Sequence, residues 1–171
     1  MNIFITGTPG AGKSSLISEL IEYAKQQGMH YCGMLTPEIR KNNIRVGFKI
    51  IALPKMKEEI LASVDYAKPK VSKYGVNVLA IERIIDIVEE DFKDAELVFI
   101  DEIGKMEMLS ERFKEFLSKA LGSDKKVIAT LNLALLKEYK NYGRLLWLSK
   151  QNYSEVKKKL FAFLANDCAE N

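Results

Sequence analysis

Residues 7–14 carry glycine, lysine and serine at a spacing that suits the binding of a phosphate chain. Gly7, Gly12, Lys13 and Ser14 match the pattern G-x-x-x-x-G-K-[ST], after an apolar run and at the start of a helix-periodic segment. Glycines let the backbone wrap phosphates with its N–H groups pointing inward, and the following helix adds a positive dipole. Lys13 can reach the β- and γ-phosphates, and the Ser14 hydroxyl can ligate Mg²⁺. The pattern predicts a P-loop; the ordinary alternative is a flexible glycine turn with a chance lysine.

Two adjacent carboxylates, Asp101 and Glu102, end the apolar run 97–101. Buried like charges are costly unless a positive group lies nearby, and phosphate-bound Mg²⁺ would be such a group. In P-loop proteins an acidic residue at the end of a neighbouring strand holds the metal, usually through water, and Asp101 fits that role. Glu102 follows directly, where it can orient or deprotonate a water near the γ-phosphate. The alternative for Glu102 is a solvated acid at a strand end.

These two motifs define the candidate site. We expect Lys13 and Glu102 to be catalytic, and Ser14 and Asp101 to ligate Mg²⁺. The residues that we expect to contact the nucleotide are Gly7, Thr8, Pro9, Gly10, Ala11, Gly12, Lys13, Ser14, Ser15, Asp101, Glu102, Ile103 and Gly104.

Several classes of P-loop protein compete for this pattern. The stretch DEIG (101–104) satisfies the D-x-x-G motif of GTPase switches, but the chain has no N-K-x-D tetrapeptide to read guanine. A small-molecule kinase is the main alternative, because kinases often cover their acceptor with a segment placed like 36–75. Kinases have reason to avoid a water-activating glutamate. They also commonly carry an arginine-rich lid, whereas the segment 132–150 has Arg144 as its only arginine. Hydrolysis of nucleoside triphosphates is therefore favoured, and a nucleotide-gated binding module is a third alternative.

The elements that must position these residues alternate along the chain. Short apolar runs predict strands at 2–6, 30–35, 97–101, 126–131 and 144–149. Apolar residues at helical spacing predict helices over 16–24 before Gly28, over 81–92, from an N-cap at Ser110 to Gly122, and over 153–164. This repetition predicts an α/β fold with a mostly parallel sheet and helices on both faces.

Residues 36–75 break this alternation, because they contain no convincing helix. The pair Asn42-Asn43 between β-prone residues indicates a hairpin, since asparagine tolerates positive φ. Large apolar residues alternate with glycine and lysine over 46–50, as in a half-buried antiparallel strand. We expect residues 36–75 to be a β insertion that lies over one end of the sheet, within a single P-loop domain spanning 1–171.

The composition excludes several other classes. The chain has 171 residues, 47% hydrophobic and 29% charged, with 26 basic and 23 acidic side chains and a formal charge of +3. This balance gives no electrostatic reason to expect a nucleic-acid partner. Cys32 and Cys168 belong to no metal-binding or redox motif. The first apolar run is too short for a signal peptide, and no run reaches the length of a membrane span, so we expect a cytoplasmic protein without a membrane partner.

The sequence resembles a small nucleoside-triphosphatase family found in archaea, thermophilic bacteria and animals. The resemblance rests on IFITGTPGAGKSSL, GMLTPEIRKNNIRVGFKIIAL, KYGVNV and VFIDEIGKMEM, and it extends over nearly the whole chain. It implies Mg²⁺-dependent, slow hydrolysis of nucleoside triphosphates such as ATP and GTP to the diphosphate and phosphate, with broad base tolerance. It also implies a monomer whose P-loop strand and acidic strand are separated by one other strand. By matching position, residues 7–14 would bind phosphates, Asp101 magnesium, and Glu102 the catalytic water.

Two features depart from that family. Members often have basic or histidine residues after the strand that corresponds to 127–131, where this chain has NLALL, and many have Asn-Arg where this chain has Asn152 and Tyr153. If the missing arginine helps to hold nucleotide, affinity or base preference could differ here.

Four further features have weaker support. Thr130 and Asn132 end a strand where P-loop ATPases often place a polar γ-phosphate sensor, and strand-end capping is an equal alternative. Arg40 and Arg45 flank the predicted hairpin and could reach the phosphates, although exposed hairpin arginines are usually solvated. Tyr74 could form the floor of a base pocket, but core packing is the simpler account. Lys105 and Glu107 belong to the resemblance without an evident role, and we assign no catalytic role to His30, the only histidine.

Overall fold

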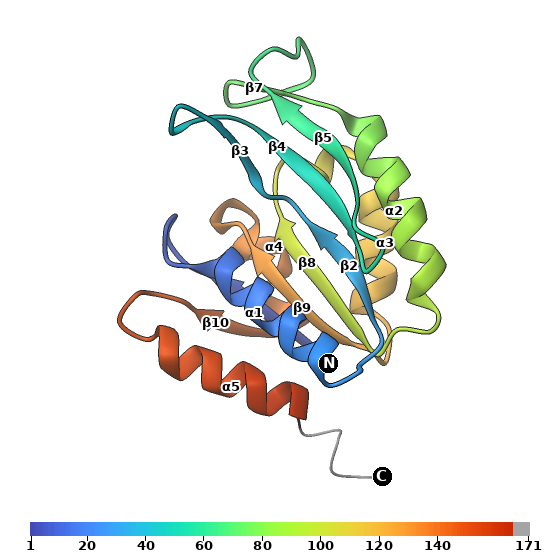
Figure 1. The fold of residues 1–171 in the computed structure, drawn as a ribbon, viewed down its shortest axis with the longest axis vertical. Coiled ribbons are helices and arrows are strands. Elements are labelled where there is room, and N and C mark those ends of the chain that lie inside the picture. Colours follow the sequence, from blue (N-terminus) through green and yellow to red (C-terminus); the bar gives the residue numbers. More distant parts are fainter. Residues whose placement is uncertain (166–171) are drawn as a thin grey trace.

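Ten strands share one sheet in the computed structural model, which describes residues 1–165 (Figure 1). The strands are β1 (Asn2–Thr6), β2 (Tyr31–Leu35), β3 (Glu38–Lys41), β4 (Ile44–Leu53), β5 (Lys57–Ser63), β6 (Lys70–Val71), β7 (Tyr74–Val76), β8 (Leu97–Ile103), β9 (Lys126–Leu131) and β10 (Arg144–Trp147). The α-helices are α1 (Lys13–Gln26), α2 (Val78–Phe92), α3 (Glu111–Leu121), α4 (Leu136–Tyr139) and α5 (Tyr153–Ala165). Short 3₁₀ helices are η1 (Glu107–Leu109), η2 (Leu133–Leu135) and η3 (Lys140–Tyr142).

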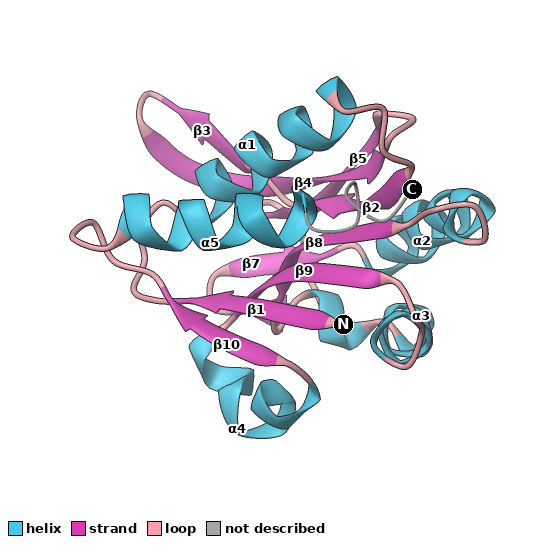
Figure 2. Ribbon diagram, turned by 90° about the horizontal axis from the view of Figure 1, so that it is seen from below, coloured by secondary structure: helices cyan, strands magenta, loops and turns pink. Residues whose placement is uncertain are grey.

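Five neighbouring strands form the parallel part of the sheet, in the order β10-β1-β9-β8-β2. Their central residues are apolar on both faces because helices cover both sides. Helices α1 and α5 pack on one face and α2 and α3 on the other (Figure 2). The predicted α/β fold is confirmed, and β9 lies between the P-loop strand β1 and the acidic strand β8, as the resemblance implied.

The helix boundaries follow the predicted capping residues. Helix α1 ends shortly before Gly28, whose φ of +68° is readily adopted by glycine. Helix α3 begins after Ser110, whose hydroxyl accepts a hydrogen bond from the Phe113 N–H at 3.1 Å, and it ends at Gly122. These caps fix where each helix begins and ends, and therefore which loops reach the carboxyl edge of the parallel strands.

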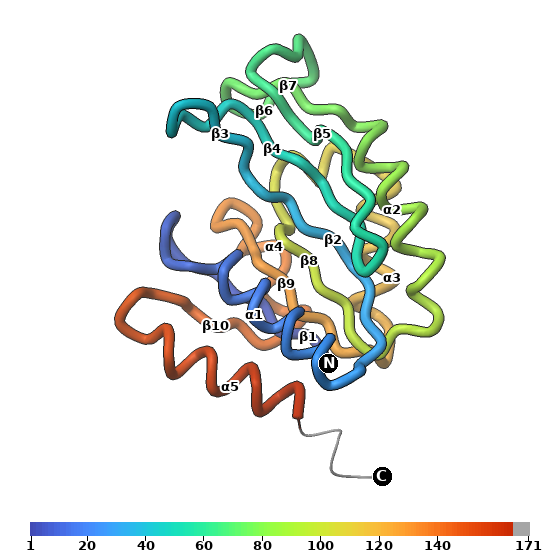
Figure 3. The backbone as a smooth tube through the Cα atoms, viewed as in Figure 1, coloured from blue at the N-terminus to red at the C-terminus, as the bar shows by residue number. Residues whose placement is uncertain are grey.

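The segment 36–75 consists of strands and turns, as predicted. Asn42 and Asn43 form its first turn with φ values of +50° and +62°. The predicted position of the insertion over one end of the sheet is wrong. Strand β4 pairs antiparallel with β2, and strands β5, β7 and β6 then extend the same sheet (Figure 3). Without β4, strand β2 would be an edge with unpaired N–H and C=O groups, and the insertion satisfies them.

Two findings bear on the other expectations. Within residues 1–165, no helix is long and apolar enough to cross a membrane. Cys32 is a buried free thiol, and Cys168 lies outside the described residues.

Candidate functional site

The loop between β1 and α1 has the strand–loop–helix context that the motif predicts. Gly7, Gly10 and Gly12 have φ values of +149°, +80° and +95°, a region that residues with a Cβ rarely adopt. A Cβ at Gly7 would lie 2.3 Å from the Leu148 carbonyl oxygen. A Cβ at Gly12 would lie 2.9 Å from the ring of Tyr153. The glycines therefore allow both the bend of the loop and its close packing on the chain after β10.

Lys13 and Ser14 open helix α1, so they lie at its positive end. The Lys13 Nζ donates to the carbonyl oxygens of Gly7 and Thr8 at 3.0 and 3.2 Å, which holds the ammonium over the loop. The Ser14 hydroxyl is hydrogen-bonded to the carboxylate of Asp101. Two motifs about 90 residues apart in the chain are thus joined at the carboxyl edge of the sheet.

Asp101 is buried near the end of β8, which continues to Ile103 rather than ending at residue 101. Its Oδ1 accepts a 2.5 Å hydrogen bond from the Thr130 hydroxyl, and its backbone carbonyl accepts one of 2.7 Å from Thr36. Burial raises the pKa of the Asp101 carboxyl, while the bonds from Thr130 and Ser14 and the charge of Lys13 lower it. The group is therefore a desolvated carboxylate whose side-chain partners are hydroxyls.

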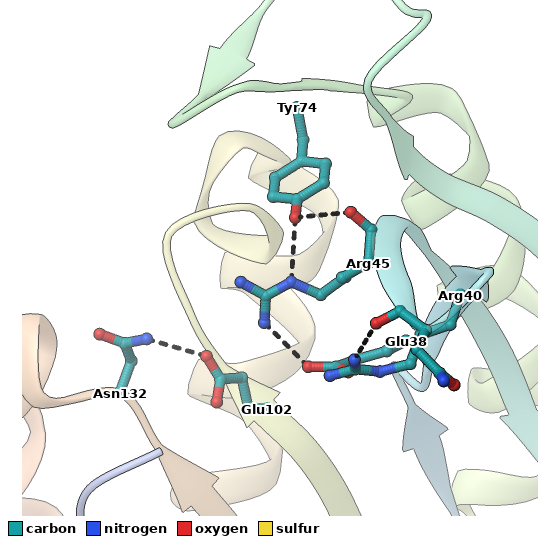
Figure 4. Close-up of polar contacts among 7 residues, drawn as sticks. Glu38, Arg40, Arg45, Tyr74, Glu102 and Asn132 are labelled. Carbon is teal, nitrogen blue, oxygen red and sulfur yellow. Dashed lines mark hydrogen bonds and ion pairs between the residues drawn. The ribbon is translucent and has the colours of Figure 1, made fainter. Parts of the chain in front are cut away.

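Glu102 points into the same space from the next position, and the peptide bond between Asp101 and Glu102 is cis. Its Oε1 accepts a 2.9 Å hydrogen bond from the Asn132 side-chain amide, whose own oxygen accepts from the Ala134 N–H at 3.1 Å (Figure 4). Burial raises the pKa of Glu102, the Asn132 bond opposes the rise, and the nearby charge of Asp101 adds to it. Glu102 is therefore a held, partly desolvated carboxylate and not a freely solvated strand-end acid.

Thr130 and Asn132 each bind one of the two carboxylates. Thr130 is fully buried on β9, and Asn132 follows that strand and borders the open space of the site. Because β8 and β9 are parallel neighbours, their polar ends meet at one edge. The geometry makes both residues partners of the acids, and contact of either with a γ-phosphate stays a prediction.

A third carboxyl group, that of Glu107, lies behind Glu102. Gly104 separates them: a Cβ there would lie 2.6 Å from Glu107 Oε2 and 2.8 Å from Glu102 Oε1. Burial, together with the charges of Glu102 and Asp101, raises the pKa of Glu107 to about 8, although hydrogen bonds from the N–H groups of residues 107 and 104 oppose the rise. Sequence reasoning gave Glu107 no role, although the spacing D-E-x-x-x-x-E was visible.

The raised pKa of Glu107 predicts a pH-dependent stability. Between its ordinary pKa of 4.5 and about 8, the folded protein holds a proton that the unfolded chain releases, so the free energy of unfolding falls as pH rises through this window. Glu107→Gln should remove this contribution. The free energy of unfolding of Glu107→Gln, taken relative to that of the parent, should rise by on the order of a few kcal/mol from pH 5 to pH 8.

Urea unfolding at both pH values measures this difference, with the exposed Glu115→Gln on the neighbouring helix as a control. Equal pH dependence in the parent and in Glu107→Gln would contradict the prediction.

The site opens into a cleft of about 580 Å³ that runs from the P-loop to the β insertion. The predicted site residues that line it are Gly7, Pro9, Gly10, Gly12, Lys13, Ser14, Ser15, Asp101 and Glu102. Thr8, Ala11, Ile103 and Gly104 are not among the lining residues, and Ala11 and Ile103 are buried. Nucleotide contact through these four residues stays a prediction.

Other lining residues were not predicted as part of the site. They are Thr36, Glu38, Phe48, Val71, Ser72, Met106, Leu131 and Leu133, together with Glu107. Thr36 could have been found, because a polar residue after a buried strand is a signal of the carboxyl edge. Half of the others come from the insertion, and their position at the cleft depends on how the insertion extends the sheet.

The remaining candidate residues differ in whether they line the cleft. Arg45 and Tyr74 line the cleft, whereas Arg40 does not. His30 lies before β2, at the opposite end of the sheet, where its carbonyl accepts from the N–H groups of residues 96 and 97.

Asn152 bonds within the turn 147–152, and the Tyr153 hydroxyl donates to Glu19 at 2.8 Å. At the position where the resemblance led us to expect arginine, this chain therefore places an aromatic ring against Gly12.

The donor set suits a small, hard divalent cation. Among the described residues, no cluster of three His, Cys, Asp or Glu side chains could hold a metal by itself. Mg²⁺ needs no such cluster, because it is usually bound by one or two carboxylates together with water and substrate phosphates. The Asp101 carboxylate and the Ser14 hydroxyl meet at the start of the phosphate-binding helix, so the residues present fit Mg²⁺ bound together with nucleotide.

Comparisons with known proteins point to one protein family. The model of a protein family described as NTPase matches residues 2–161. The nucleoside-triphosphatase THEP1 of Methanocaldococcus jannaschii is 39% identical over 169 residues, covering 96% of this chain and 99% of the relative. That of Pyrococcus abyssi is 35% identical, covering 91% and 88%.

Two solved structures are similar over nearly their whole length. The crystal structure of THEP1 from Aquifex aeolicus has a TM-score of 0.82 and 30% identity, covering 96% of this chain and 99% of that one. The solution structure of a human cancer-related nucleoside triphosphatase has a TM-score of 0.76 and 25% identity, covering 96% and 97%.

Proposed function

The chain belongs to the NTPase family, and from this premise we propose that it is an Mg²⁺-dependent nucleoside-triphosphatase. The proposed reaction converts ATP, GTP and other nucleoside 5′-triphosphates to the diphosphate and phosphate. Residues 1–171 would act as a single-domain monomer. The relatives are named nucleoside-triphosphatases, and the substrate class is carried over from those names.

The observation that carries the proposal is the placement of Glu102 in the cleft beside the P-loop. It lines the same space as Lys13 and Ser14, and the amide of Asn132 fixes one of its oxygens. A carboxylate at this position is a candidate base for water, which a hydrolase requires and a kinase has reason to avoid.

The P-loop would bind the phosphates, as its sequence and its conformation both suggest. Backbone N–H groups at the start of α1 would meet the β- and γ-phosphate oxygens, and the Lys13 ammonium would move from the loop carbonyls to these oxygens. Ser14 and Asp101 would hold Mg²⁺, which would neutralise the negative charge that develops on the phosphates during the reaction.

In the proposed reaction, Glu102 accepts a proton from water as the water oxygen bonds to the γ-phosphorus. The bond from phosphorus to the β–γ bridging oxygen breaks, and the diphosphate leaves with that electron pair. Partial burial supports the role of Glu102, because it raises the pKa and so makes the carboxylate a better base. Lys13 would stabilise the charge on the leaving oxygens.

The proposal predicts phosphate release that needs no acceptor. Purified protein with Mg²⁺ and ATP or GTP should release phosphate at a rate that added nucleosides or nucleoside monophosphates leave unchanged. Chelation of Mg²⁺ should stop the release, because the phosphates would then lack the cation that neutralises their charge. Phosphate and phosphorylated products can be followed in the same samples.

Other results would point to the alternative functions. A phosphorylated acceptor that forms faster than free phosphate would make the protein a kinase. Negligible release that a cell extract increases many-fold would make it a nucleotide-gated binding module.

A further inference from the structure

Arg45 brings a positive charge from the β insertion to the phosphate-binding cleft. It lies near the start of β4 and lines the same cleft as Lys13, Asp101 and Glu102. In Figure 4 its guanidinium lies between Tyr74 and Glu102, with Asn132 on the far side of Glu102. The insertion thus adds a cation to the cleft that the P-loop also lines.

Two hydrogen bonds hold this side chain in place. The Arg45 Nε donates to the Tyr74 hydroxyl at 2.9 Å, and Nη1 donates to Glu38 Oε1 at 2.8 Å. The Tyr74 hydroxyl donates in turn to the Arg45 carbonyl oxygen at 3.4 Å. Among the described residues, no hydrogen bond occupies Nη2, so one end of the planar fork remains available to an oxyanion.

Two aromatic rings restrict the guanidinium further. It lies 5.3 Å from the ring centre of Phe48 and 5.7 Å from that of Tyr74, and the rings pack edge to face. Tyr74 is buried, which makes it a fixed support on β7. Because such restraints reduce the rotamer freedom that binding would otherwise remove, Arg45 is preorganised for a ligand.

The neighbouring cations lack this arrangement. Arg40 also binds Glu38, but it donates to the Asn43 carbonyl at 2.8 Å and does not line the cleft. Lys105 lines the cleft but is exposed and, in the described part of the chain, has no ion pair. Because Glu38 pairs with both arginines, its single carboxylate does not fully neutralise Arg45.

We propose that Arg45 is a further catalytic residue whose guanidinium contacts the terminal phosphate of the bound nucleotide and stabilises the charge on its oxygens. Tyr74 and Glu38 are positioning residues for Arg45. The inference rests on the proposed triphosphatase function. It gives the β insertion a role in that function: the extended sheet supplies a second positive group in addition to Lys13 of the P-loop.

Arg45→Ala, Arg45→Lys and the matched control Arg40→Ala test this assignment. Binding of fluorescent nucleoside diphosphate and of a non-hydrolysable triphosphate analogue gives the preference for the γ-phosphate without turnover. Arg45→Ala should lose most of that preference, and its kcat should fall by about 10–100-fold. This is less than the about 10³–10⁵-fold of well-enclosed arginines, because Glu38 and solvent screen the group. Arg45→Lys should retain only part of the γ-phosphate preference and of kcat, since lysine lacks the planar fork.

Arg40→Ala should remain within about twofold of the parent in both measurements, because its charge would not reach the ligand. Tyr74→Phe keeps the ring but removes the hydroxyl that positions Arg45, so it should lower both kcat and the preference for the γ-phosphate, each by less than Arg45→Ala does. Equal behaviour of Arg45→Ala and Arg40→Ala would overturn the inference, and so would equal weakening of diphosphate and triphosphate binding. A parent protein that releases no phosphate would refute the proposed function, while the binding comparison would still decide the role of Arg45.

Discussion

Lys13→Ala should lower turnover by about 10²–10³-fold or more, the range for loss of a single preorganised charge-stabilising donor. The side chain supplies the positive charge of the P-loop, and its Nζ lies over the loop carbonyls of Gly7 and Thr8. Alanine is a good helix former at the start of α1, so the helix should be retained. The expected loss is therefore electrostatic.

Nucleotide affinity should also fall, because Lys13 meets the β- and γ-phosphates in the ground state as well as in the transition state. Fluorescent-nucleotide titration and phosphate release at saturating substrate separate these two effects. Lys25→Ala, in the last turn of the same helix, controls for the loss of one positive charge. Normal turnover of Lys13→Ala would refute the P-loop assignment.

The P-loop could be predicted from sequence because its determinants are local. Gly7, Gly12, Lys13 and Ser14 lie within eight residues, and the backbone angles required at the glycines leave few alternatives. The caps at Ser110 and Gly122 were predictable for the same reason. Each of these features depends on neighbours in the chain and not on how the sheet assembles.

The hydrogen-bond partners of the two carboxylates were harder to predict from the sequence. Asp101 and Glu102 were recognisable as a strand-end pair, but their partners Thr130 and Asn132 come from a strand about 30 residues later. Their roles depend on β8 and β9 being neighbours in a defined register. The sequence left a phosphate sensor and a strand-end cap as equal alternatives at these positions, and the register brings both side chains to the acids.

The insertion shows where sequence reasoning fails. Its strands and its Asn42-Asn43 turn were predictable, but which strand edge they would join was not. Pairing of β4 with β2 brings β4 and β7 to the cleft, and with them Arg45 and Tyr74. A contact between residues 29 positions apart leaves no local signal, so the sequence could not distinguish Arg45 from Arg40 as the hairpin arginine that lines the cleft.

Glu102→Gln should reduce turnover by about 10²–10⁴-fold, the range for a positioned general base. Glutamine keeps the size of the side chain, and its carbonyl oxygen can still accept the hydrogen bond from Asn132. What it loses is basicity. If Glu102 acts only on water, the affinity for the Mg²⁺–nucleotide complex should remain close to that of the parent.

Asp101→Asn provides the contrast, because Asp101 is proposed to hold the cation. That variant should bind the Mg²⁺–nucleotide complex more weakly and turn over more slowly, and both losses should diminish at higher Mg²⁺. Equilibrium binding and single-turnover phosphate release on both variants separate the two roles. If Glu102→Gln hydrolyses within a factor of about three of the parent, the carboxylate cannot be the base, since such a group contributes at least about 10²-fold. Glu102 would then only orient water through a hydrogen bond, which the amide can also do.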